Sequence, residues 1–242
     1  MSSLYETLTP LKFKERLEQL PVAYLPLGTL EWHGWHNPLG ADGLQSQLFF
    51  EQFANKYGGI VLPKLFLEPD RVKETRGDVF YGMDFCTHDA LIEYPDQQLL
   101  GSSYWVDDSF FRELLLNIVS QLHRTGFKMI VAHGHGPSVK MVQKMHEEIL
   151  KYSMDSLTLF DLPIDDLLKF QNDHAAANET SIMMVLCPNL VSSNELNNMQ
   201  EIAIAGRDPK EYASIEYGQH IIDANNKALK EAIDKWMKGR SK

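Results

Sequence analysis

The amino-acid sequence predicts a three-layer α/β/α fold, in which a mostly parallel central sheet lies between two layers of helices. Short apolar runs alternate along the chain with longer segments whose apolar residues recur at helical spacing. This alternation is typical of parallel sheets that are covered on both faces. The 242 residues contain no internal repeat, no low-complexity segment and no break in composition that would mark a linker. We therefore expect a single domain over residues 1–242.

The N-terminal part of the chain supplies two helices and two strands. Thr9 and Pro10 begin the first helix, since proline is favoured in the first turn. The apolar run at 22–28 ends in glycine and predicts a strand. A helix follows and stops at Gly58, where glycine suits a helix C-terminus. Residues 59–67 form a second apolar run and predict another buried strand.

The rest of the chain continues the alternation. In order, we expect long loops with short strands at 68–104, a helix at 106–126, a strand and glycine-rich turn at 127–136, a helix at 139–153, a strand at 156–162, a helix from 178 and a terminal amphipathic helix from 216. The apolar face expected for the helix at 106–126 consists of Phe110, Leu114, Ile118 and Leu122. Asn178 is the expected N-cap of the helix that begins there.

The composition argues against several kinds of partner. The formal net charge is −10, from 23 basic and 33 acidic residues, whereas nucleic-acid binding needs a basic field. The first residues show no basic region followed by an apolar run, and no stretch approaches the roughly 20 apolar residues that span a bilayer. Two cysteines are too few for a secreted disulfide scaffold. We therefore expect a soluble cytoplasmic protein without membrane or nucleic-acid partners.

The first candidate site follows the first predicted strand. The stretch LGTLEWHGWHNPLGAD places Glu31, His33, His36 and Asp42 within twelve positions. Ligands of open α/β sheets bind beyond the carboxyl ends of the strands, so these side chains would lie at the binding edge. Carboxylates and imidazoles together suit zinc, manganese or a similar divalent ion. A solvated acidic loop with a surface histidine would explain Glu31 and His33 about equally well.

Two later segments carry the same chemistry. The strand end IVAHGHGPS contains His133 and His135, with glycines that let the backbone turn closely beside a ligand. The segment DHAAANETS contains His174 and Glu179. Taken alone, a loop histidine is more often simply exposed, and Glu179 could merely favour a helix N-terminus by its charge. Two strand ends with the same residue types favour a shared site.

Together the three segments resemble the motifs of the creatininase (creatinine amidohydrolase) family. The first family motif, Glu-x-His-Gly-x-His-x-Pro-Leu-x-x-Asp, is matched at every fixed position by EWHGWHNPLGAD at 31–42. The second is an Asn-Gly-His-Gly-like turn, which HGHGPS at 133–138 resembles. The third, His-Ala-Gly-x-x-Glu-Thr-Ser, is similar to HAAANETS at 174–181. The resemblance covers about residues 20–220.

The resemblance implies a binuclear metal hydrolase with a creatininase-like domain and two divalent ions per chain, zinc or manganese. The metal ligands that it implies are Glu31, His33, Asp42, His135 and Glu179. Asp42 would bridge both ions, and Glu31 and His135 would complete the site of one. His33 would belong to the other ion, together with Glu179, because the family's usual carboxylate position holds a proline here.

The resemblance also implies a mechanism. Two such ions would lower the pKa of a bridging water, and the resulting hydroxide would attack a carbonyl of a small cyclic amide. His174 would deliver a proton to the leaving nitrogen, since imidazole titrates near neutral pH. The residues expected to contact the substrate are His36, His133, Ser103 and Trp105. The family also implies a homo-oligomer, a hexamer built as a trimer of dimers.

Departures from the family motifs leave the substrate open. His133 stands where the family has asparagine, and Ala176 where it has glycine. Hydrolytic C–C ring opening of a keto-inositol or related oxidised sugar uses the same attack on a carbonyl and is the main alternative. A metal-binding protein without catalysis is a second alternative. Arg71 and Arg76 could bind an anionic substrate or simply lie at the surface.

Overall fold

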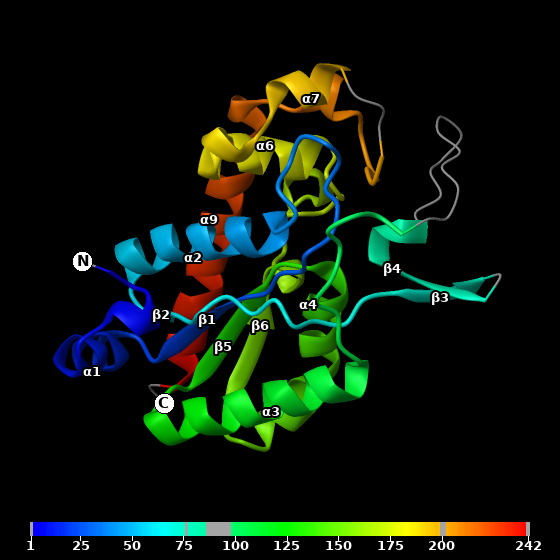
Figure 1. The fold of residues 1–242 in the computed structure, drawn as a ribbon. Helices are drawn as coiled ribbons and strands as arrows, with labels where there is room; N and C mark the ends of the chain where they lie inside the picture. Colours follow the sequence, from blue (N-terminus) through cyan, green and yellow to red (C-terminus); the bar gives the residue numbers. More distant parts are fainter. Residues whose placement is uncertain (1, 76, 86–97, 199–201, 241–242) are drawn as a thin grey trace.

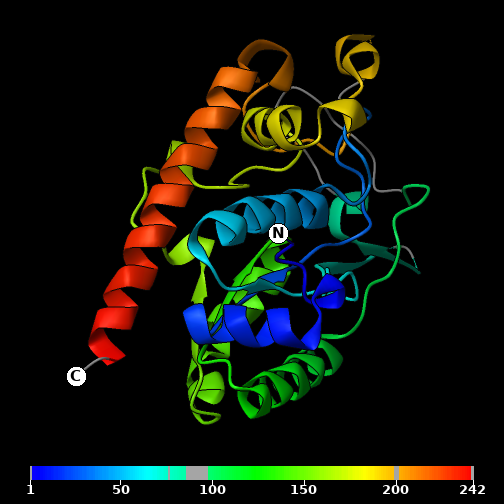
Figure 2. The same cartoon turned by 90° about the vertical axis from the view of Figure 1, so that its left-hand side faces the viewer.

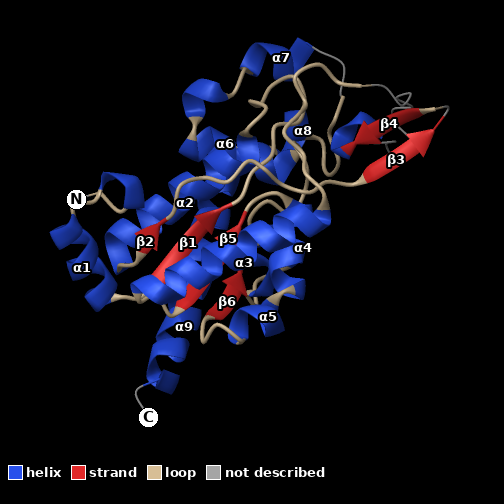
Figure 3. Ribbon diagram, turned by 60° about the horizontal axis from the view of Figure 1, so that its bottom comes forward, coloured by secondary structure: helices blue, strands red, loops and turns tan. Residues whose placement is uncertain are grey.

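The central sheet of the computed structural model, which describes residues 2–75, 77–85, 98–198 and 202–240, has four strands in the order β2-β1-β5-β6 (Figure 1). The strands are β1 (Val22–Pro26), β2 (Ile60–Val61), β5 (Met129–His133) and β6 (Asp155–Thr158). Every pairing in this sheet is parallel, which confirms the prediction of a mostly parallel sheet. A separate antiparallel hairpin of β3 (Val72–Thr75) and β4 (Asp78–Tyr81) extends away from it (Figure 3).

Helices cover both faces of the sheet and complete the predicted three layers (Figures 1 and 2). The helices are α1 (Pro10–Gln19), α2 (Ala41–Tyr57), α3 (Asp108–Thr125), α4 (Gly136–Lys144), α5 (His146–Leu150), α6 (Ala177–Leu186), α7 (Ser193–Asn198), α8 (Pro209–Tyr212) and α9 (Ile215–Arg240), with 3₁₀ turns at Tyr5–Thr7, Gly82–Phe85, Leu159–Asp161, Asp166–Leu168 and Pro188–Leu190. Within the described residues, no helix is both long and apolar enough to cross a membrane.

The alternation of side chains along β1 divides the core into two parts. Val22 and Tyr24 pack with residues of α2, α6 and α9 on one face. Ala23 and Leu25 pack with residues of α3, α4 and α5 on the other face. Successive side chains of a strand point to opposite faces, so a strand between two helical layers must be apolar throughout. All five residues of β1 and of β5 are accordingly buried.

Three strands are shorter than the apolar runs that predicted them, and β1 ends at Pro26, two residues before the end of its run at 22–28. β2 covers Ile60–Val61 rather than 59–67, because Pro63 has no N–H to offer to the ladder. Pairing with the segment after β1 resumes only as a single bridge at Leu65. β6 begins one residue earlier than predicted and ends at Thr158, where a capping box with Asp161 opens a 3₁₀ turn.

The buried face of α3 differs from the predicted one. It consists of Phe111, Leu115, Val119 and Leu122, whereas Phe110 is 52% exposed. Two apolar rows with the same helical spacing lie side by side on this helix, and only packing against the sheet distinguishes them. The predicted helix at 139–153 is also divided, into α4 and α5, at Met145.

The N-terminus of α6 is capped by a residue outside the helix. The helix begins at Ala177, and Asn178 is not its N-cap as predicted. The side chain of Asn178 instead donates to the carbonyls of Leu167 and Lys169. The Asp173 carboxylate accepts the N–H groups of Asn178 and Glu179, at 2.8 and 3.0 Å, and satisfies the first turn from the preceding loop.

The carboxyl ends of β1 and β5 lie side by side, which brings the two histidine-containing loops together. Pro26 pairs with His133, and the N–H of Leu27 donates to the His133 carbonyl at 2.8 Å. The chain then turns at Gly134, whose φ is 139°. A Cβ at this position would lie 1.7 Å from the carbonyl oxygen of Leu27. Only glycine fits where the two loops approach so closely.

Gly134→Ala is therefore expected to lower the free energy of unfolding by about 3 kcal/mol or more, through backbone strain and a clash with Leu27. Gly136→Ala is a matched control, because nothing in the described part of the chain lies within 4 Å of a Cβ there. That variant is expected to stay within about 1 kcal/mol of the parent. Denaturant unfolding measures both values, and equal effects of the two substitutions would contradict the prediction.

Candidate metal centre

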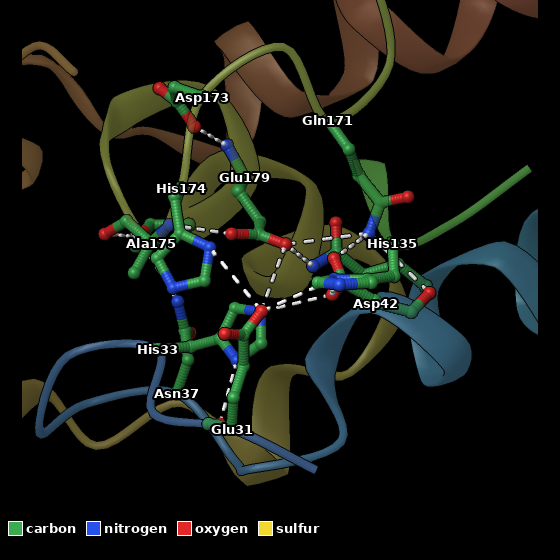
Figure 4. Close-up of polar contacts among 12 residues, drawn as sticks. Glu31, His33, Asn37, Asp42, His135, Gln171, Asp173, His174, Ala175 and Glu179 are labelled. Carbon is green, nitrogen blue, oxygen red and sulfur yellow. Dashed lines mark hydrogen bonds and ion pairs between the residues drawn. The ribbon is translucent and has the colours of Figure 1, made fainter. Parts of the chain in front are cut away.

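Acidic and imidazole side chains from four parts of the chain converge at the carboxyl edge of the sheet (Figure 4). Two come from the loop after β1, one from the first turn of α2, one from the turn after β5 and one from the first turn of α6. In that order they are Glu31, His33, Asp42, His135 and Glu179. Each is at most 6% exposed. The structure thus brings together the five residues that the sequence predicts as metal ligands.

One oxygen of Asp42 lies between the two imidazoles of the cluster. Asp42 Oδ2 is 3.4 Å from His33 Nε2 and 3.3 Å from His135 Nδ1. Glu31 Oε1 lies 3.2 Å from His135 Nδ1, and Glu179 Oε1 lies 3.7 Å from His33 Nε2. The ligand atoms therefore form two groups of three that share Asp42, with all atoms of each group within 4.8 Å of one another.

The hydrogen bonding of His33 shows that its group fits a cation. His33 Nδ1 lies 3.1 Å from the carbonyl oxygen of Glu31, and since a carbonyl only accepts, Nδ1 carries the proton. Nε2 points at the carboxylates of Asp42 and Glu179 and has no hydrogen-bond partner among the described residues. A lone pair that faces two carboxylates is unfavourable unless a positive charge lies between them. One nitrogen and two carboxylate oxygens suit zinc or manganese.

In the absence of a metal ion, protons supply part of that positive charge. Burial disfavours a charged His33, but the carboxylates of Glu179 and Asp42 outweigh it and raise the pKa of His33 to about 10. Burial raises the pKa of Glu179 to about 8. Protons and metal ions therefore compete for the same atoms, and metal affinity should rise with pH.

Metal removal is consequently expected to destabilise the protein more at high pH. The folded pKa of His33 lies above its unfolded value of 6.5, so its stabilising effect is complete below pH 6.5 and is lost as pH rises through about 10. The raised pKa of Glu179 acts in the same direction. The difference in melting temperature between metal-loaded and chelated protein should widen by on the order of 5 °C between pH 6.5 and 9. Thermal scans at several pH values measure it, and a constant or narrowing difference would contradict the expectation.

His174 lies beside the cluster with one ring nitrogen anchored. Its Nε2 donates to the carbonyl oxygen of Trp32 at 2.7 Å, which leaves the Nδ1 lone pair 3.9 Å from Glu31 Oε1. The ring stacks on His33 with centroids 4.4 Å apart. Burial and the charge on His33 lower the pKa of His174 to about 3, so its imidazole is neutral at physiological pH. Glu31, His33 and His174 also form a third group that could hold an ion.

A cavity of about 710 Å³ opens onto the cluster. Glu31, Asp42, His135 and His174 form part of its wall, so a small molecule in the cavity would reach all four. Arg71 also lines this cavity, whereas Arg76 lies outside the described residues.

The other predicted substrate contacts lie away from this wall. His36 is buried and bonds through Nε2 to the hydroxyl of Thr180, 2.8 Å away. His133 is buried edge-on between Phe160 and Phe170, with both centroids at 5.2 Å. Neither ring is among the described residues that line this cavity, and a direct contact with substrate stays a prediction for them.

Ser103 and Trp105 lie in the segment that crosses over the loop after β1. The N–H of Ser103 donates to the Leu30 carbonyl at 2.8 Å, and its exposed side chain does not line the cavity. Trp105 donates through Nε1 to the hydroxyl of Thr29 and stacks on Tyr81 at 4.8 Å. Trp105 lines a second hollow of about 770 Å³, which shares two acidic wall residues with the first, so its contact with substrate also stays a prediction.

Three polar residues reach the cluster from segments without a sequence motif. Asp70 Oδ2 lies 3.5 Å from His135 Nε2, the ring nitrogen that points away from Glu31 and Asp42. The amides of Gln45 and Gln171 contact carboxylates of the cluster. Asp70 and Gln171 lie in loops and Gln45 lies on α2, and none of them has a recognisable spacing in the sequence, so only the folded chain reveals these contacts.

Fold and site together define an α/β protein with a candidate binuclear metal centre at the carboxyl edge of its sheet. A family model described as "Creatininase: Creatinine amidohydrolase" matches residues 6–232. The chain therefore belongs to the creatininase family, which confirms the resemblance seen in its motifs.

Solved structures share the fold of this chain, and a curated relative matches part of its sequence. A creatinine amidohydrolase (creatininase) crystal structure has a TM-score of 0.73 at 18% identity, with 97% of both chains covered. A putative creatinine amidohydrolase from Bacteroides fragilis NCTC 9343 has a TM-score of 0.64 at 20% identity, with 96% of both covered. The 3-dehydro-scyllo-inosose hydrolase of Thermotoga maritima is 28% identical over 144 residues. That match spans 59% of this chain but only 39% of the relative, so it leaves most of the relative unmatched.

Proposed function

We propose that this protein is a binuclear metal-dependent hydrolase that opens a small cyclic amide. The observation that carries the proposal is the Asp42 carboxylate on the cavity wall, one oxygen of which lies within 3.4 Å of both imidazoles. Glu31 and His135 would hold one ion with Asp42, and His33 and Glu179 would hold the other. When bound, two such ions supply a Lewis acid for the substrate carbonyl and an activated water molecule. Solved creatininase structures include a Zn–Zn type and a Mn form, which supports these metals.

The residues of the chain would supply charge, orientation and a proton site. The carboxylates of Glu31 and Asp42 would balance the positive charge of the two ions, which the substrate carbonyl needs beside it in order to be polarised. The Trp32 carbonyl fixes the tautomer of His174 and leaves Nδ1 free to accept a proton. A neutral imidazole at the cavity wall can take a proton from the attacking water and return it to the leaving nitrogen.

The test is an assay of the metal-loaded protein on two panels of substrates. Creatinine and other five- and six-membered cyclic amides form the first panel, with ring opening followed by NMR. Metal-dependent opening of any cyclic amide, abolished by chelation and restored by zinc or manganese, is the expected result. Protein that contains two ions but opens no cyclic amide would contradict the proposal.

A second candidate is the hydrolytic opening of a keto-inositol ring. The named activity of the Thermotoga maritima relative, a 3-dehydro-scyllo-inosose hydrolase, favours it. A ketone accepts the same nucleophile as an amide, but a carbon takes the place of the leaving nitrogen and must itself receive the proton. The second panel therefore consists of keto-inositols. Turnover of keto-inositols and of no cyclic amide would show that the protein catalyses this ring opening instead. Metal binding without turnover in either panel would favour a non-catalytic protein.

A further inference from the structure

The side-chain amide of Gln171 contacts carboxylates from both ligand groups of the candidate metal centre. It lies in the loop before α6, lines the cavity and is only 6% exposed (Figure 4). Its Nε2 lies 3.1 Å from Asp42 Oδ1 and 3.4 Å from Glu179 Oε1. We propose that Gln171 is a positioning residue that holds Asp42 and Glu179 in the orientation in which they bind the two ions. The metal part of this inference rests on the proposed function.

The orientation of the Gln171 amide is determined by its neighbours. The hydroxyl of Ser46 donates to Gln171 Oε1 at 3.2 Å. Asp42 and Glu179 must be ionised to bind metal ions, and an ionised carboxylate only accepts hydrogen bonds, so the NH₂ group must face them. Ser46 lies on α2, one turn after Asp42, and is fully buried. The amide is thus clamped between a donor on one side and two acceptors on the other.

Because of this contact, the two oxygens of Asp42 have different partners. Oδ1 receives the Gln171 amide, whereas Oδ2 is the oxygen that faces His33 and His135. If Oδ1 were free, the carboxylate could rotate and offer one oxygen to each ion. With Gln171 in place, Oδ1 is occupied, and Asp42 would offer the single oxygen Oδ2 to both groups of ligands. The side-chain amide therefore sets how the bridging carboxylate binds.

Asp42 depends on Gln171 more than Glu179 does. Glu179 Oε1 also accepts from Gln45 at 3.1 Å, and its Oε2 accepts the N–H of Ala175 at 2.5 Å. Among the described residues, the other close partners of the Asp42 carboxylate are the imidazoles of the cluster. Loss of Gln171 should consequently affect both ions, whereas loss of Gln45 should affect only the ion next to Glu179.

The backbone at Gln171 gives independent support. Its φ is 52°, in the left-handed region that glycine adopts most easily. A glutamine held there costs free energy, and such strain persists where the surrounding structure fixes it, often at functional sites. Here the strained residue is the one whose amide joins two carboxylates of the cluster, so the strain accompanies a specific contact.

The central test replaces Gln171 with methionine, which keeps the length of the side chain and removes both the donor and the acceptor. Competition with graded chelator, followed by metal analysis, measures the affinity for each ion. Gln171→Met is expected to weaken both ions by roughly 10- to 100-fold, as other residues that support metal ligands do. In the Mn-loaded protein, the EPR signature of the coupled ions should also change, because Asp42 is free to rotate.

Two matched variants separate positioning from general destabilisation. Gln45→Met should weaken only one of the two ions, since Gln45 contacts Glu179 and not Asp42. Gln47→Met should leave both affinities unchanged, because Gln47 lies on the same helix but bonds to Glu51. A merely structural role for Gln171 would lower the free energy of unfolding without weakening the binding of either ion and without changing the EPR signature.

Ser46→Ala provides a second route if Gln171→Met does not fold. It removes the hydroxyl that orients the amide and should weaken metal binding by roughly 2- to 10-fold, as expected for the loss of one hydrogen bond. Affinities within about twofold of the parent in the folded variants, with an unchanged EPR signature, would overturn the inference. A parent that binds two ions but opens no substrate would refute the proposed function and leave this inference supported by the affinities. A parent that binds no metal would overturn both.

Discussion

Asp42→Asn is expected to abolish binding of both metal ions and to lower kcat/KM by on the order of 10⁴-fold. Asp42 Oδ2 lies 3.4 Å from His33 Nε2 and 3.3 Å from His135 Nδ1, so a single carboxylate oxygen faces both imidazoles. An asparagine has nearly the same shape but carries no negative charge. Each group of ligands would keep one carboxylate and one imidazole, too few to hold an ion tightly. Metal analysis of the purified variant and steady-state kinetics measure the two effects.

The matched control for this variant is Asp108→Asn. Asp108 lines the same cavity but is exposed at the start of α3, away from the ligand groups. This variant should retain two ions per chain, so a loss of metal in Asp42→Asn alone would be specific to the shared position. An Asp42→Asn protein that still binds two ions would refute the bridging role of Asp42.

Much of the fold and of the ligand cluster could be predicted from the sequence. Apolar runs at 22–28 and 129–132 indicate strands buried on both faces, and the polar residues after them must lie at one edge of a parallel sheet. Glu31, His33 and His135 are therefore predicted to meet before any coordinates are known. Glu179 required the family motif, since an acidic residue in the first turn of a helix is common for electrostatic reasons alone.

What the sequence could not predict depends on packing between distant segments. Either of two apolar rows could have been the buried face of α3, and contact with the sheet selected the one with Phe111. Gln171 is 129 positions from Asp42, and no pattern links a loop glutamine to a carboxylate on another element. His133 stands where the family motif has asparagine, and nothing in the sequence indicates that its ring is buried between two phenylalanines. The single domain, the oligomeric state and the cytoplasmic location stay predictions.

His174→Gln is expected to retain two metal ions and to lower kcat by roughly 10²- to 10⁴-fold, the range typical of a lost general acid–base. His174 Nε2 is anchored to the Trp32 carbonyl, and Nδ1 is the atom left to exchange a proton. A glutamine can keep the bond to that carbonyl but cannot accept and return a proton. The fall should be in kcat rather than in substrate affinity, because the proton moves only during the reaction.

Metal content distinguishes a proton-transfer role of His174 from a role as a metal ligand, which the geometry also allows. Glu31, His33 and His174 also form a possible ligand group, and a ligand role would make His174→Gln lose an ion together with its activity. Two observations argue for the proton role: His174 lies on the cavity wall, and its Nδ1 is 3.9 Å from Glu31 Oε1, farther than the imidazole–carboxylate distances in the two groups that share Asp42. His220→Gln, on the exposed face of α9, should change neither metal content nor kcat. Retained metal with full activity in His174→Gln would exclude both roles and assign the proton transfer to a different group on the wall.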